Sequence, residues 1–137
     1  MPTAKEIEQA HKTLFEAGIQ LRREVVGDAY VDATLKRFST EHGKHLQALL
    51  TEVGWGWIWS RPGLDRKQRS LLNLGMLCAL NRSTELAVHV KGALNNGLSE
   101  VEIREALIQP ASFEGFRVAE KVIGEYKENE GKVKAKL

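Results

Sequence analysis

Glu85 and His89 are the two residues of this sequence whose types and spacing best suit acid–base chemistry. They are four positions apart in a segment with helical periodicity, so their side chains can meet on one face of a helix. A neighbouring carboxylate raises the pKa of an imidazole and selects one of its tautomers, which would make His89 a proton donor near neutral pH. Solvated surface pairs show the same spacing, so the pattern alone is compatible with either role.

The surroundings of this pair favour a site at the edge of a core. Leu86 and Val90 place the adjoining helix face inward, so His89 is expected near the core boundary. Three basic residues are candidates for holding an anionic substrate, although each is also compatible with a solvated helix charge: Arg69, Arg82 and Lys91.

Metal and thiol chemistry find little support in the sequence. His42 and His45 are three residues apart, but no further ligands complete a set, so no metal site is predicted. Cys78 is the single cysteine, which excludes an internal disulfide and a CxxC pair. It lies in an apolar run and is expected to be an inert core thiol.

The composition indicates a globular protein with one domain's worth of chain. The 137 residues are 42% hydrophobic and 28% charged, and the net charge of +2 is too balanced for a typical nucleic-acid binder. Residues 85–107 have helix-turn-helix proportions, but the acidic second helix would repel a phosphate backbone. No apolar run reaches the roughly 18 residues of a membrane span, and no export signal is visible, so we expect a cytosolic protein.

The helical periodicity predicts an all-α bundle of about six helices over residues 1–127, followed by a basic, flexible tail over 128–137. Start signals are expected at Thr3, Ser39 or Thr40, Asp65, Ser83 or Thr84, Ser99 and Ser112, and stop signals at Gly27, at Gly54 with Gly56, at Gly97 and at Pro110.

Two segments carry apolar side chains that must be shielded from water. The helix containing residues 71–80 is apolar almost all round, which marks it as the central buried helix and predicts a homo-oligomer that covers the remainder. Residues 55–59 contain three tryptophans and are expected to form a loop or single turn. This segment could plug the core, contact another subunit, or line a substrate pocket with Trp57 and Trp59.

The central stretch resembles the carboxymuconolactone decarboxylase family, with weaker similarity over residues 21–28. The residues that carry the resemblance are Trp57-Ile58-Trp59-Ser60-Arg61-Pro62-Gly63-Leu64, Arg69-Ser70-Leu71, Glu85-Leu86 with His89, Ala93-Leu94-Asn95-Asn96-Gly97, and Glu102-Ile103-Arg104-Glu105. The resemblance implies an alkylhydroperoxidase-D-like fold, assembled as a trimer or hexamer. It also implies cofactor-free conversion of 4-carboxymuconolactone to β-ketoadipate enol-lactone, in the protocatechuate branch of aromatic degradation.

The resemblance also implies roles for individual residues. His89 would be the proton donor or oxyanion partner, with Glu85 orienting it. Arg69 and Arg82 would anchor carboxylates, and the tryptophan segment would keep water out. Redox relatives of this fold carry two cysteines on the helix corresponding to residues 85–96, and this sequence has none there, so peroxidase activity is disfavoured.

The sequence departs from the family pattern after Gln109. The family's Tyr-Cys-Gly-x-Pro-Ala segment is not intact, because Gln109 to Gly115 runs directly into Phe116-Arg117-Val118-Ala119-Glu120. The alternative hypothesis is therefore a divergent member that is non-catalytic or acts on another small carboxylated or cyclic metabolite.

Overall fold

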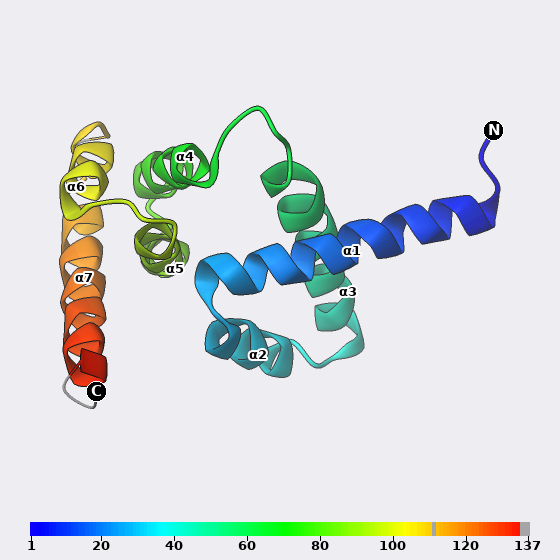
Figure 1. The fold of residues 1–137 in the computed structure, drawn as a ribbon, viewed down its shortest axis with the longest axis horizontal. Coiled ribbons are helices and arrows are strands. Elements are labelled where there is room, and N and C mark those ends of the chain that lie inside the picture. The colour runs from blue at the N-terminus through cyan, green and yellow to red at the C-terminus, as the bar shows by residue number, and fades with distance from the viewer. Residues whose placement is uncertain (111, 135–137) are drawn as a thin grey trace. The chain divides into compact units, whose positions relative to one another are not determined.

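The computed structural model describes residues 1–110 and 112–134, and this part of the chain is all-α, as predicted (Figure 1). It contains seven α-helices and one π-helix, with no strand among the described residues. The contacts divide the chain into two compact units, Met1–Leu64 and Asp65–Leu137. In the described ranges, no helix combines the length and apolar character that a membrane crossing requires.

The first unit holds α1 (Ala4–Val26), α2 (Asp28–Arg37), α3 (Glu41–Leu49) and the π-helix η1 (Leu50–Trp59). Thr3 begins α1 with the predicted capping box, and Gly27, at φ 89°, ends it. Of the two predicted caps for α3, Thr40 is the one used, because its hydroxyl accepts a hydrogen bond from the Gly43 N–H at 3.1 Å. Within this unit α1 packs along η1, while α2 packs on α1 and α3 on η1.

The expectation that Gly54 and Gly56 end a helix, with residues 55–59 forming a loop or single turn, is wrong. The chain continues through both glycines as η1. Gly56 is required by packing instead, because a Cβ at this position would collide with the carbonyl oxygen of Leu14 in α1. Gly18 on α1 meets the carbonyl of Thr51 in the same way. The glycines therefore let two helix backbones touch.

The second unit holds α4 (Arg66–Ala79), α5 (Ser83–Asn95), α6 (Glu100–Ile108) and α7 (Phe113–Lys134). The predicted capping boxes at Asp65 and Ser99 are both present. Helix α5 begins at Ser83, which is one of the two starts predicted, the other being Thr84. No side chain caps this end of the helix. Its end is the predicted left-handed cap, with Gly97 at φ 85° and the Leu98 N–H bonded to the Ala93 carbonyl at 2.9 Å.

The core of the second unit uses one face of α4, and the opposite face carries the apolar remainder that the sequence predicts a second subunit to cover. Leu74 and Cys78 are buried, and the sulfur is a core thiol as expected. Leu72 and Met76, on the other side, are each 53% exposed. The core cluster comprises Leu74, Cys78, Leu86, Val90, Ala93, Leu98, Ile103, Leu107 and Ala119.

The end of the chain is more helical than the sequence indicated. Ser112 accepts a hydrogen bond from the Gly115 N–H at 3.3 Å, which fits the predicted start of the last helix. Helix α7 then runs to Lys134, through most of the segment expected to be a flexible tail, while residues 135–137 lie outside the described residues. The single domain with its boundary at residue 127 stays a prediction.

Candidate active site

The candidate site lies where α4 and α5 pack together in the second unit (Figure 1). Asn73 of α4 places its amide nitrogen Nδ2 3.5 Å from Nδ1 of His89 on α5. A second bridge joins the same helices, with Asn96 Nδ2 donating to the buried hydroxyl of Ser70 at 3.0 Å. Ser70 precedes Asn73 on α4, whereas its partner Asn96 follows His89 along the chain. The two helices therefore run antiparallel.

His89 is partly buried at the edge of the core, as predicted, between the buried residues Leu86 and Val90 of its own helix. Its pKa, however, moves in the direction opposite to the prediction. Burial disfavours the charged imidazolium and lowers the pKa of His89 below 6.5, and attraction from Glu85 offsets only part of this effect. The ring is therefore neutral at neutral pH.

Glu85 is ionised and held at the start of α5. A hydrogen bond from its own backbone N–H is the main cause that lowers the pKa of the Glu85 carboxyl, and Arg82 adds to it. Arg82 Nη2 donates to Glu85 Oε1 at 2.9 Å. The structure thus joins two of the predicted site residues to each other, and Glu85 acts on His89 through its charge.

The remaining predicted cations lie differently. Arg69 is partly buried on α4, one helical turn before Asn73, so it shares the helix face that carries the bridge to His89. Lys91 is exposed and only two residues after His89, which places it on another side of α5. Of these two predicted cations, Arg69 is the one on the Asn73 face of α4.

Trp57 and Trp59 both lie in η1, in the first unit. The guanidinium carbon of Arg61 lies 5.3 Å from the centre of the Trp57 ring, and Trp57 is 53% exposed. Trp59 packs on Trp55 with ring centres 4.9 Å apart. Their part in substrate binding stays a prediction.

Sequence reasoning missed Asn73 as a site residue. The signal that could have found it is its position, because it interrupts an otherwise apolar run on α4. A polar side chain in such a place needs a hydrogen-bond partner. That partner, His89, is sixteen residues away in the sequence and cannot be identified from local spacing.

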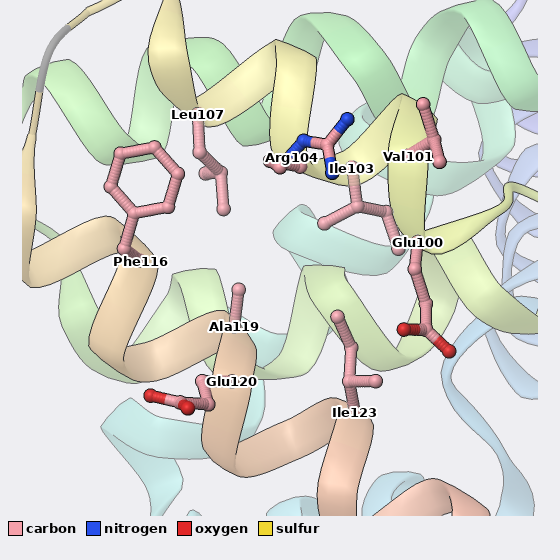
Figure 2. A pocket seen from close by; sticks show the side chains of 9 residues that line it. All are labelled: Glu100, Val101, Ile103, Arg104, Leu107, Phe116, Ala119, Glu120 and Ile123. Atoms are coloured by element: carbon pink, nitrogen blue, oxygen red, sulfur yellow. The ribbon is translucent and has the colours of Figure 1, made fainter.

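A separate hollow lies between α6 and α7, with a volume of about 370 Å³ (Figure 2). Ile103 and Leu107 from α6 face Phe116 and Ala119 from α7, and Arg104 lies at the edge. None of the predicted site residues lines it. Over residues 1–110 and 112–134, no three His, Cys, Asp or Glu side chains gather in a way that could hold a metal ion.

Comparison with known proteins places this helical arrangement in a family. The sequence model of the carboxymuconolactone decarboxylase family matches residues 44–128, which is more than half of the chain. The chain is 42% identical over 136 residues to the nitrosuccinic acid decarboxylase npaB of Metarhizium robertsii, covering 90% of this chain and 94% of that protein. It is 33% identical over 115 residues to the 4-carboxymuconolactone decarboxylase of Acinetobacter baylyi, covering 79% and 85%. With the family model, the all-α fold and both relatives in agreement, this chain belongs to the carboxymuconolactone decarboxylase family.

Proposed function

We propose that this protein is a cofactor-free decarboxylase of a small dicarboxylic acid and that its substrate is nitrosuccinate. The observation that carries the choice of substrate is the 42% identity to the nitrosuccinic acid decarboxylase, which extends over 94% of that relative. The relative that acts on 4-carboxymuconolactone is 33% identical over a shorter stretch.

The chemistry needs no cofactor because the substrate supplies its own electron acceptor. In nitrosuccinate, one carboxylate is attached to the carbon that bears the nitro group. When the bond between this carbon and the carboxylate breaks, CO2 leaves and the electron pair moves into the nitro group, which gives a nitronate. A proton then adds to the same carbon, and the product is 3-nitropropanoate. The protein has to bind carboxylates, stabilise the nitronate oxygens and allow protonation.

His89 is suited to stabilise the developing negative charge. Because its pKa is lowered by burial, the ring is a neutral hydrogen-bond donor and not an imidazolium acid. A neutral imidazole N–H in a partly desolvated place can stabilise an oxyanion without giving up its proton. Of the two roles that the family resemblance implies, this favours the oxyanion partner.

We assign different roles to Arg69 and Arg82. Arg69, one turn from Asn73, is the cation proposed to bind the carboxylate that the substrate retains. Arg82 already donates to Glu85, so we assign it to holding that carboxylate near His89. For Arg82, holding Glu85 is favoured over anchoring the substrate.

The second candidate substrate is 4-carboxymuconolactone, favoured by the 33% identity to its decarboxylase. Here the electron pair released with CO2 would delocalise through the ring C=C into the lactone carbonyl. The dienolate oxygen would then take the place of the nitronate oxygen, and the same neutral N–H would serve it.

The test is a direct assay of CO2 release from both compounds, with products identified by NMR and the uncatalysed rate subtracted. We expect catalysed release from nitrosuccinate, and loss of roughly 10²-fold in kcat for His89→Gln. His42→Gln, at an exposed histidine of α3, is the matched control and is expected to match the wild type. The absence of catalysed release from both compounds would support the non-catalytic alternative.

We also propose that the chain assembles with copies of itself, since Leu72, Met76 and Leu80 leave an apolar stripe exposed along α4 and just beyond its end. Light scattering at micromolar concentration is expected to give an oligomer, and the double variant Leu72→Lys/Met76→Lys a smaller species. Thr84→Lys, at an exposed polar position of α5, is the control. A wild-type monomer contradicts this proposal. The cytosolic location stays a prediction.

A further inference from the structure

We propose that Asn73 is a positioning residue, whose side-chain amide holds His89 in the tautomer that carries its proton on Nε2. By doing so, Asn73 decides which ring nitrogen donates to the charge that develops during decarboxylation. The kinetic part of this inference rests on the proposed function, whereas the tautomer itself can be observed without any substrate.

The atoms that meet determine the tautomer. Asn73 Nδ2 lies 3.5 Å from His89 Nδ1 in a partly buried contact. An amide nitrogen can only donate, so Nδ1 must accept with its lone pair. A neutral imidazole carries one proton, and the proton is then on Nε2. Burial keeps the ring neutral, which makes the distinction between tautomers meaningful at neutral pH.

The fold explains why an asparagine stands at this position. Residue 73 lies on α4 directly before the buried Leu74, on the side that packs against α5. An amide placed there loses hydration and needs a partner, which the ring of His89 supplies. An apolar residue would fit the helix equally well, but it would remove this donor from Nδ1.

The tautomer matters because the two ring nitrogens act oppositely toward an oxyanion. With the proton on Nε2, this nitrogen can donate to a nitronate or dienolate oxygen. With the proton on Nδ1, Nε2 would present a lone pair to the same oxygen and repel it. Loss of Asn73 is therefore expected to lower kcat far more than it changes KM, because the interaction forms only as charge develops.

The experiment is long-range 1H–15N NMR of the 15N-labelled full chain, with the His89 signals assigned from their absence in His89→Gln. The wild type is expected to show the protonated nitrogen at Nε2. In Asn73→Asp, a side chain of nearly the same shape accepts instead of donating, so at a pH where the ring is neutral the proton is expected to move to Nδ1. In Asn73→Leu, a mixture of both tautomers is expected.

Asn96→Ala is the matched control, since it breaks the other α4–α5 bridge, at Ser70. It is expected to lose stability as Asn73→Leu does but to keep the wild-type nitrogen signature. A wild-type ring protonated on Nδ1, or an unchanged signature in Asn73→Asp, overturns the inference.

Kinetics then separate this inference from the proposed function. With nitrosuccinate, at a pH where the ring is neutral, kcat of Asn73→Asp is expected to fall roughly 10²-fold with KM nearly unchanged. Asn73→Leu is expected to lose only the share of kcat that corresponds to its Nδ1-protonated tautomer. Wild-type turnover in Asn73→Asp overturns the positioning role. A different outcome is that the NMR signatures are as expected but the wild type turns over neither substrate. This outcome would support the tautomer assignment and reject the proposed function.

Discussion

Arg82 and Glu85 form an ion pair across the first turn of α5, with Nη2 2.9 Å from Oε1. The carboxylate expected to orient His89 is therefore itself held by an arginine. The backbone N–H of Glu85 chiefly, with Arg82 adding to it, lowers the pKa of the Glu85 carboxyl and keeps it ionised. Its negative charge raises the pKa of His89, yet burial of the imidazole has the larger and opposite effect. The environment of His89 is thus set by burial first and by the acid one turn away second.

Replacing Glu85 by Gln is expected to lower the pKa of His89 further. The substitution keeps the size of the side chain and removes a charge that stabilises the imidazolium. NMR titration of the His89 ring proton measures the effect. Glu105→Gln, at an exposed acid on α6, is expected to leave the titration curve in place. An unchanged or raised pKa in Glu85→Gln would show that the two side chains do not interact.

Acidification is expected to destabilise the protein through His89. Because its pKa in the folded state lies below 6.5, the unfolded chain binds a proton at pH values where the folded chain does not. The contribution of His89 to the free energy of unfolding is therefore fully present above about pH 6.5 and falls as the pH drops toward the folded pKa.

Urea unfolding at about pH 7.5 and about pH 5.5 measures this change, and His89→Gln provides the comparison. The wild type is expected to lose more free energy of unfolding between the two conditions than the variant does. Equal losses would mean that His89 has the same pKa in the folded and unfolded states.

Replacing Gly56 by Ala is expected to destabilise the protein by about 1–3 kcal/mol, because the added methyl group collides with the backbone carbonyl of Leu14 and forces α1 and η1 apart. Gly54→Ala is the matched control in the same helix, since open space surrounds that position. The control is expected to be neutral or stabilising by up to about 1 kcal/mol. Chemical denaturation of both variants decides, and similar stabilities would refute the close-approach argument.

The helix boundaries that the sequence predicts correctly are those set by local chemistry. Thr3, Asp65 and Ser99 form capping boxes with side chains three residues on, and Gly97 adopts the left-handed conformation that ends α5. Gly56 could not be predicted in this way. A glycine that ends a helix and a glycine that lets another helix approach look alike until the neighbour, here α1, is known.

The site shows the same division between local and distant effects. The spacing of Glu85 and His89 correctly predicts an electrostatic influence of the acid on the ring. The net direction of the pKa change depends on how deeply the fold buries His89, which spacing along one helix does not reveal. The contact with Asn73 also depends on the packing of α4 on α5, so it required the structure.

Gly115 and Cys78 are predicted to be energetically coupled across the second unit. A Cβ at Gly115, in the first turn of α7, would collide with Sγ of Cys78 on α4, while the nearest Leu107 atom would lie at an acceptable 3.6 Å. Gly115→Ala alone is therefore expected to cost about 1–3 kcal/mol.

Cys78→Ala removes the sulfur and leaves a small void, with an expected cost of about 1 kcal/mol. In the double variant the new methyl group occupies the space of the lost sulfur, so the two costs should not add. A coupling of about 0.5–3 kcal/mol, measured by urea unfolding of all four proteins, is the expected result. Gly124→Ala, at an exposed position of α7 with open space around it, should show no coupling to Cys78→Ala. If the costs at Gly115 and Cys78 do add, then α7 can move away from α4, and the small residue at 115 is not required for their contact.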